Sequence, residues 1–562
     1  MNMKLRKIFI TLLITGAFMS CSRRQLDRLL DNPNTPSPTA ANADLYLTQV
    51  QLSFAGFFDG ASDFGMQLTR QTVFFGPTYG NGYVPQSYDG LWETAYASIV
   101  KNADALIPIA EAQKKYVNVG MTRILKAYTM MTLVDMFGDV PFIEANLGVE
   151  NTNPKADNGK DVYAAAIALL DAAIADLAKP PGSYPGSQDL FYGAGNATGA
   201  KKWVTLAKTL KLRAYVQTRL ADAGAKAKID ALLTENDLID TQAEDFEFKY
   251  STKQANPNSR HPKYNNNYTS TNDANDYMST WFMWALVQEK GTGNANNDPR
   301  TRYYFYRQRT NFGEANESSM QCINSAPPAH YPAGTPFCFL ISGYWGRDHG
   351  DNSGIPPDGN LRTTVGIYPF GGEFDASQGT SVSLNRGAQG AGIEPIWLSV
   401  FTEFIKAEAA LILTTAGDPK TLLESGVRKS FTKVFRFPAT ASVTITNPAL
   451  DMNLPANQPR LDGYVNKVLA LYDAATTTNE KLDVIMKEYY IALWGNGLDA
   501  YNNYRRTGKP TNMQPTRLVG SGEFVRSHLY PSVYINRNQN AVQKSSVGLR
   551  VFWDTNPPGF IK

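Results

Sequence analysis

Residues 91–142 read LWETAYASIVKNADALIPIAEAQKKYVNVGMTRILKAYTMMTLVDMFGDVPF and predict a hairpin of two helices around a short polar break. Apolar side chains recur every three or four residues in both halves, which is the spacing of one helix face. The first helix is expected to bend or end at Pro108, and the turn to lie at 118–120. Because glycine tolerates the left-handed conformation that ends helices, the second helix is expected to stop at Gly138, and Pro141 prevents it from resuming.

The second helix of this hairpin is expected to have one buried face and one exposed face. Lys126 and Thr129 are expected to point outward. The expected buried face consists of Met121, Ile124, Leu125, Tyr128, Met131 and Asp135. A face of this kind needs a partner helix, and the first half supplies the same period.

Similar periodicity predicts further helices on both sides of a long irregular region. Asp161 is a plausible N-cap for one of them. The expected helices cover residues 45–58, 161–177, 203–221, 396–415, 464–472 and 479–494. Two successive helix-turn-helix units over 91–221 suggest tetratricopeptide-like packing. Residues 240–395 are rich in Asn, Gly, Pro and aromatic residues, and we expect the ligand-facing loops there.

The N-terminus has the features of a secretion signal. Three basic residues precede the apolar run 8–19, which is too short to span a membrane, and Ser20 and Cys21 follow it. A small residue followed by cysteine is similar to a bacterial lipobox, so we expect residues 1–20 to be removed and Cys21 to carry lipid. Residues 21–43 then form a lipidated tether rich in Pro, Asn, Ser and Thr.

The charge of the chain argues against nucleic acid as a partner. The 54 Lys and Arg face 51 Asp and Glu. Since the expected signal peptide holds three of the basic residues and no acidic one, the mature chain carries no net charge. Phosphate binding needs an excess of basic side chains on one face.

Several segments resemble the SusD/RagB family of Bacteroidetes outer-membrane lipoproteins, nearest to its starch-binding-associated branch. They are DMFGDVPF at 135–142, WVTLAKTLKLRAYVQTRL at 203–220, DPR at 298–300, GYWGRDHGDNSGIPPD from Gly343 and YNNYRRTGKP from Tyr501. The resemblance covers most of the mature chain. It implies a mainly α body over 44–562, with a helical scaffold at about 44–235 and 396–505 and the loop-rich part between them.

The same resemblance implies a function. Members of the family capture oligosaccharide, without catalysis, and deliver it to a SusC-like TonB-dependent transporter in the outer membrane. Other members bind peptides, so peptide capture by the same architecture is the alternative. Arg23 and Arg24 follow Cys21 at positions where surface-exported members commonly have acidic residues. The resemblance implies the cell surface as the location, but these two arginines leave the leaflet open.

The sequence predicts no catalytic or metal site. The four histidines are scattered without a zinc-binding motif. Glu373 and Asp375, or Asp348 and Asp351, are pairs that a glycosidase would use, which keeps an anchored hydrolase as a third hypothesis. No cofactor is expected, although oxygen ligands among residues 348–360 leave calcium open; the acidic spacing of an EF-hand is missing.

Aromatic residues in Gly- and Pro-rich segments predict the ligand site. Sugar rings stack their C–H faces on aromatic rings, and neighbouring polar side chains bond the hydroxyls. We expect Trp345 to be the main stacking residue. The other expected contacts are Tyr344, Arg347, Asp348, Tyr79 and Tyr83. Trp281 and Trp284, three residues apart, are instead expected to be core residues.

The chain has three cysteines. Cys322 and Cys338 flank a Pro-rich loop in a chain expected to be exported, and with Cys21 lipidated each has only the other as a partner. We therefore expect a disulfide bond between them.

Overall fold

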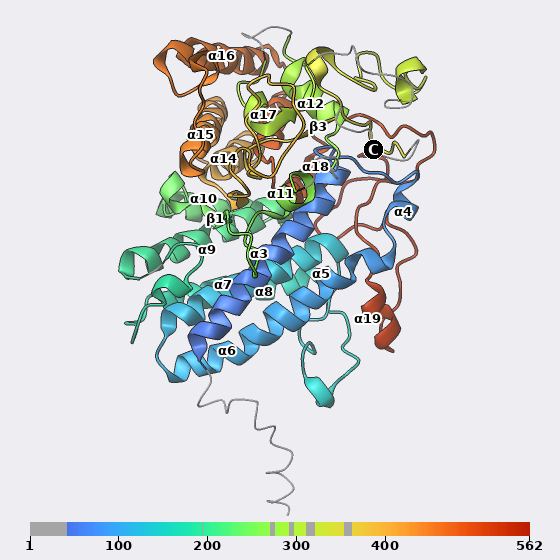
Figure 1. Ribbon diagram of the computed structural model, residues 1–562. Helices are drawn as coiled ribbons and strands as arrows, with labels where there is room; N and C mark the ends of the chain where they lie inside the picture. The colour runs from blue at the N-terminus through green and yellow to red at the C-terminus, as the bar shows by residue number, and fades with distance from the viewer. Residues whose placement is uncertain (1–41, 194, 270–275, 292–296, 311–320, 353–361) are drawn as a thin grey trace, which may run out of the picture. The chain divides into compact units, whose positions relative to one another are not determined.

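Helices form most of the regular structure of the protein, whose computed structural model describes residues 42–193, 195–269, 276–291, 297–310, 321–352 and 362–562 (Figure 1). Residues 44–562 form one compact unit. The signal peptide, Cys21 and nearly all of the tether lie outside the described residues, so the expectations about them stay predictions.

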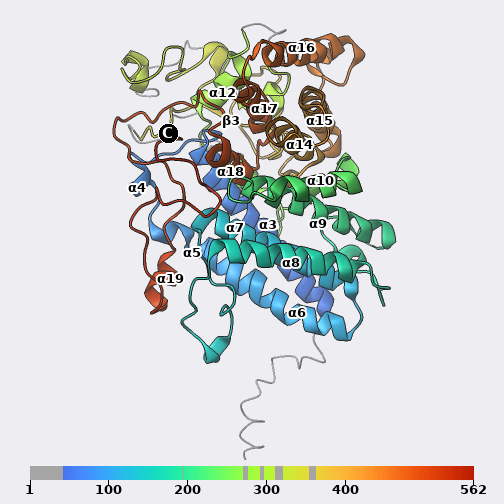
Figure 2. The same ribbon diagram turned by 180° about the vertical axis from the view of Figure 1, so that it is seen from behind.

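The first part of the unit is a run of helices. These are α3 (Ala43–Leu68), α4 (Tyr79–Gly82), α5 (Asp89–Glu93), α6 (Lys101–Ala112), α7 (Tyr116–Phe137), α8 (Gly159–Leu177), α9 (Ala197–Thr218) and α10 (Ala225–Glu235). A π-helical segment at Thr94–Val100 joins α5 to α6. In both ribbon views α6 to α10 follow one another as neighbouring, roughly antiparallel helices (Figures 1 and 2). The predicted helical hairpin scaffold is confirmed.

The middle part has short elements separated by long loops. Its helices are α11 (Pro262–Asn267), α12 (Thr280–Val287) and α13 (Thr301–Tyr304), and its strands are β1 (Phe246–Lys249), β2 (Phe305–Arg307), β3 (Thr363–Val365) and β4 (Ile393–Trp397). The strands form two antiparallel pairs, β1 with β4 and β2 with β3. Phe246 faces Trp397 in the first pair, and Phe305 faces Val365 in the second.

Helices return in the last part. They are α14 (Ser399–Leu413), α15 (Pro419–Thr440), α16 (Gln458–Ala474), α17 (Thr478–Ala492), α18 (Gly497–Thr507) and α19 (Ser532–Arg537). The sequence pattern did not predict α10, α15 or α18 as separate helices. In α18 the reason is plain, because its buried side chains include Arg505, Arg506 and Asn502, which form hydrogen bonds inside the protein instead of an apolar stripe.

The hairpin at 91–142 differs from the prediction in its turn. Pro108 lies inside α6, and the turn falls at 113–115, while residues 118–120 belong to α7. Gly120 is a packing residue, since an added Cβ would lie 2.5 Å from Leu177 Cγ of α8. Helix α7 ends at Gly138, as predicted; the φ of Gly138 is +76°, but its ψ of −116° lies outside the left-handed helical region.

Helix α7 is buried on nearly all sides, so the prediction of one buried and one exposed face is only partly correct. Thr129, expected to point outward, is buried, and its hydroxyl donates to the Leu125 carbonyl at 2.8 Å. Lys126 is half-buried. A helix at the centre of several others needs apolar residues around its whole circumference, or polar residues that form hydrogen bonds within the helix itself.

Asp135 of α7 is a buried hub that joins distant parts of the chain. Its carboxylate accepts hydrogen bonds from Tyr163 Oη at 2.6 Å, Asn502 Nδ2 at 2.8 Å and Trp553 Nε1 at 2.9 Å. It also pairs with Arg213 Nη2 at 3.1 Å. Several donors thus compensate one buried negative charge.

A glycine contact brings α3 against α18. A Cβ added to Gly65 would lie 2.1 Å from the Gly497 carbonyl oxygen, and one added to Gly497 would lie 2.1 Å from the Ser62 carbonyl oxygen. Only the absence of both side chains allows the two backbones to approach this closely.

Asparagine residues cap the starts of α8 and α9. Asn158, rather than Asp161, caps α8, because its side chain accepts from the Lys160 N–H. Asn196 caps α9 in the same way through the Gly199 N–H. Both are short polar side chains of the type that N-caps favour.

Candidate ligand-binding site

Trp345, the expected stacking residue, is buried, with 1% of its surface exposed. Its ring packs against the disulfide bond that joins Cys322 and Cys338, whose Cα atoms are 5.6 Å apart. Gly346 allows this packing, since a Cβ there would lie 2.1 Å from the Met278 carbonyl oxygen. The expectation that Trp345 offers an open ring face is therefore not supported by the structure.

Tyr344 is also buried, and its ring faces the protein. The Arg307 guanidinium lies 4.8 Å from the centre of the Tyr344 ring. Arg307 Nε in turn donates to Asp375 Oδ2 at 2.6 Å. Asp375, one of the carboxylates considered for hydrolysis, is thus held in an ion pair inside the protein.

The polar residues beside Trp345 are buried too. Both oxygens of Asp348 accept hydrogen bonds, from the Cys338 N–H at 3.0 Å and from Gln514 Nε2 at 2.7 Å. Burial raises the pKa of the Asp348 carboxyl to about 6. Arg347 is 8% exposed and lies 5.1 Å from the centre of the Tyr277 ring. Most of the segment considered for calcium lies outside the described residues.

Tyr79 is the first residue of α4 and Tyr83 directly follows this helix, and only Tyr83 is partly exposed. Tyr79 Oη lies 2.9 Å from His349 Nε2 and accepts from Arg70 Nη2 at 3.2 Å. Burial raises the pKa of Tyr79 to about 12. Tyr83 donates to Gln67 Oε1 at 2.6 Å. Tyr79 still forms part of the wall of a hollow described next.

Two adjoining hollows offer room for a ligand. One measures about 500 Å³, with the loop 515–524 along its wall, and the other about 530 Å³. They share His330, Pro515 and Lys562 as lining residues. Each volume lies within the usual range of small-molecule sites.

The second hollow has an aromatic wall. Its aromatic lining residues are Trp281, Trp284, Tyr504 and Phe560. Trp281 is fully buried and donates from Nε1 to the Asn512 carbonyl at 2.8 Å. Trp284 is half-buried, and its Nε1 forms no hydrogen bond with any of the described residues. Helical spacing predicts a core role for both tryptophans, which is right for Trp281 only.

The electrostatic character of this second hollow is close to neutral. Lys562 is the one charged residue among the described lining residues. Lys487 and Glu289 lie behind the wall, where Lys487 Nζ bonds Glu289 Oε1 at 2.7 Å and lies 4.5 Å from the Trp281 ring centre. These charges are paired with each other and hold the wall in place.

Family models match both halves of the chain. The model for starch-binding proteins associating with the outer membrane matches residues 39–325, and the model for SusD and RagB outer membrane lipoproteins matches residues 390–550. The chain belongs to the SusD/RagB family. Both descriptions place the family at the outer membrane, as the sequence resemblance implies.

Solved structures of SusD relatives share the fold. A SusD/RagB family protein from Bacteroides thetaiotaomicron has 20% identity and a TM-score of 0.65, over 92% of this chain and 100% of that chain. A SusD homologue from Bacteroides fragilis has 19% identity and a TM-score of 0.66, with the same coverage. A chitin-binding SusD homologue from Flavobacterium johnsoniae has 18% identity and a TM-score of 0.59, over 91% and 99%. No curated protein sequence matches the chain.

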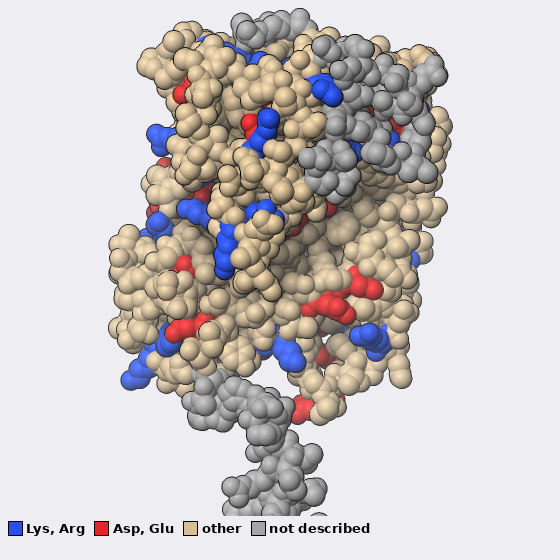
Figure 3. All heavy atoms as spheres, viewed as in Figure 1, with Lys and Arg blue, Asp and Glu red and all other residues tan. Residues whose placement is uncertain are grey.

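Two further observations concern membrane-spanning helices and the charge of the surface. Among the described residues, no helix is long and apolar enough to cross a membrane. On the face drawn in Figure 3, described Lys and Arg side chains are scattered among acidic and uncharged ones.

Proposed function

We propose that this SusD-family protein captures oligosaccharide at the outer membrane, without catalysis, and passes it to a SusC-like TonB-dependent transporter. The observation that carries the binding proposal is Trp284, a half-buried indole on the wall of a hollow of about 530 Å³, whose N–H bonds none of the described residues. An exposed ring face next to a free donor suits a sugar, which has apolar C–H faces and hydroxyl acceptors.

The near-neutral lining favours an uncharged glycan. A ligand with carboxylate or sulfate groups would need paired basic side chains, and the described lining offers Lys562 alone. The starch-binding description of the family model and the chitin-binding relative support this class of ligand. Delivery to a transporter rests on family membership.

Peptide capture is the second candidate, because a neutral aromatic hollow also accepts apolar side chains. Hydrolysis has less support. Asp375 is engaged by Arg307, and both Asp348 oxygens are bonded inside the protein, so neither pair of carboxyls considered for a glycosidase is arranged around an open site.

The test is a binding screen of neutral oligosaccharides and peptides with the purified body, followed by calorimetry on the best ligand. Trp284→Ala should weaken binding at least about tenfold, since removing a central aromatic anchor commonly costs about 2 kcal/mol and 1.4 kcal/mol is a factor of ten. Trp284→Phe keeps a ring and should lose less.

Thermal unfolding of each variant checks that the fold is intact. Equal affinity of Trp284→Ala and wild type would place the site elsewhere. Products released from any bound glycan would favour the hydrolase instead.

A further inference from the structure

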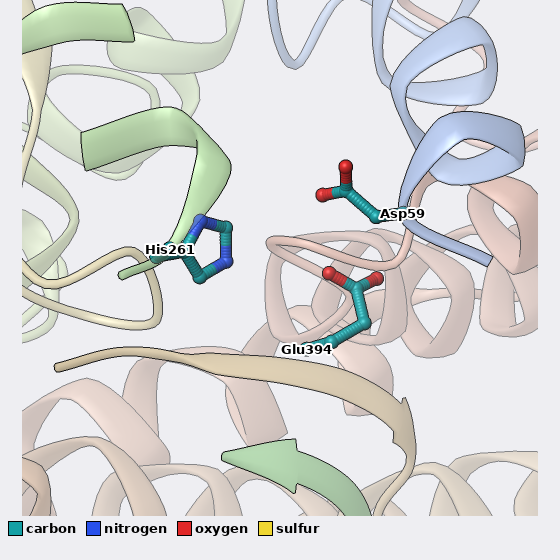
Figure 4. A group of neighbouring side chains, drawn as sticks. All are labelled: Asp59, His261 and Glu394. Atoms are coloured by element: carbon teal, nitrogen blue, oxygen red, sulfur yellow. The ribbon is translucent and has the colours of Figure 1, made fainter. Parts of the chain in front are cut away.

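Three side chains from distant parts of the chain meet beneath α3. Asp59 comes from α3, His261 is the N-cap residue of α11, and Glu394 lies on β4 (Figure 4). One ligand atom from each lies within 4.8 Å of the others. This cluster is separate from the Trp284 hollow, which none of the three residues lines.

Two polar atoms of the cluster are buried without a partner. Among the described residues, neither His261 Nε2 nor Glu394 Oε1 forms a hydrogen bond. His261 is 0% and Glu394 1% exposed. Figure 4 shows the His261 ring and both carboxyl groups turned toward a common space. Buried polar atoms are nearly always satisfied, so these two indicate an additional group between them.

Among the described residues, no lysine or arginine forms an ion pair with Asp59 or Glu394. Lys263 pairs with Asp63 and, at 3.3 Å, with Asp276. Its ammonium group is therefore already shared by two carboxylates, while the Asp59 and Glu394 carboxyls form a hydrogen bond with each other. Burial raises the pKa of Asp59 to about 6 and that of Glu394 well above its usual value. Burial also lowers the pKa of His261 to about 3, which keeps the imidazole neutral.

We propose that Asp59, His261 and Glu394 bind one divalent transition-metal ion, for which Zn²⁺ is the best fit. A neutral imidazole and two carboxylates are ligands that zinc accepts, and a water molecule would complete four-fold coordination. One divalent ion would neutralise both carboxylates. Calcium fits less well, because it requires six or more oxygen ligands. Asp59 is only half-buried, which gives an ion a path from solvent.

Metal binding has one local cost. His261 Nδ1 accepts the Lys263 backbone N–H at 3.1 Å, which places the ring proton on Nε2. An ion on Nε2 moves that proton to Nδ1 and breaks the cap of α11. Loss of one N-cap bond is small compared with the binding free energy of a protein zinc site, so the ion can outcompete the cap.

His261→Asn is the sharpest test. Asparagine is a good N-cap, so it preserves the start of α11 while removing the nitrogen ligand. Purified protein, stripped with a chelator, is titrated with Zn²⁺, and bound metal is counted by mass spectrometry. Wild type should bind one ion per chain. The variant should bind at least about a hundredfold more weakly, since even outer-shell changes cost ten- to a hundredfold.

Two further variants keep the test interpretable. Glu394→Gln removes a ligand with little change in shape and should also lose the ion. Asp63→Asn, one helical turn from Asp59, changes the same network without removing a ligand and should keep it. Added Zn²⁺ should raise the melting temperature of wild type and Asp63→Asn only.

A wild-type chain that binds no stoichiometric zinc would overturn the proposal. So would equal binding by wild type, His261→Asn and Glu394→Gln, which would show surface zinc only. Neither measurement uses a glycan, so the result is independent of the proposed function.

Discussion

The helices α6 to α10 and the loop-rich part at 240–395 are stabilised in different ways. In the helical part, neighbouring helices pack against one another, and α7 lies against α6, α8 and α9. In the loop-rich part the elements are short, and a disulfide bond, ion pairs such as Arg307 with Asp375, and close glycine contacts hold irregular segments in place. Periodic sequence therefore predicts the first part well, whereas the second depends on contacts between residues far apart in sequence.

The largest effect is expected from breaking the hub of the helical part. Asp135→Ala leaves Arg213 buried with one carboxylate partner fewer, and should lower the free energy of unfolding by about 3–5 kcal/mol. Chemical denaturation measures this change. Asp104→Ala is the control, because Asp104 is 43% exposed in its pair with Lys126 and should cost less than about 1 kcal/mol. Similar losses in both variants would contradict the central role of Asp135.

The next effect tests the loop-rich part at Trp345. Trp345→Ala removes a buried ring beside the disulfide bond and should cost about 3 kcal/mol, at the lower end for a large-to-small core change. Ligand affinity should change little if binding takes place at Trp284. Calorimetry and thermal unfolding of the same sample separate the two roles. A loss of affinity with an unchanged melting temperature would restore Trp345 as a binding residue.

The smallest effect concerns the contact of α3 with α18. Gly497→Ala places a methyl group against the α3 backbone and should cost about 1–3 kcal/mol. Gly56→Ala, also on α3 but with open space around it, should be neutral or stabilise by up to about 1 kcal/mol, because alanine favours helix. Denaturation midpoints compare the two. Destabilisation by Gly56→Ala would show that helix propensity is not the controlling factor.

The sequence predicts the structure best where one local rule decides it. The end of α7 at Gly138 needs only a residue that tolerates a positive φ, and this end of the helix is confirmed. Membership of the SusD/RagB family and the mainly α fold class are also confirmed. Pro108 shows the limit of such rules. Proline disfavours the interior of a helix, but α6 packs against α7 and continues past Pro108.

The candidate sites were harder to predict, because burial depends on distant partners. Trp345 lies in an irregular segment that suggested exposure, but Gly346 lets the segment press against Met278. Trp284 has helical spacing that suggested a core position, yet α12 leaves it half-exposed beside a hollow. Asp59, His261 and Glu394 lie far apart in the sequence and form no motif, so the sequence alone does not reveal this cluster.

The contact between Gly65 and Gly497 also sets an order of events during biogenesis. Helix α3 lies near the start of the chain, but its close-packed neighbour emerges more than four hundred residues later. The hydrogen bond from Trp553 to Asp135 likewise joins residues that are 418 positions apart. Contacts at such long separations form slowly, because a large loop must close first. A nascent chain therefore cannot complete this core until nearly all of it has been synthesised.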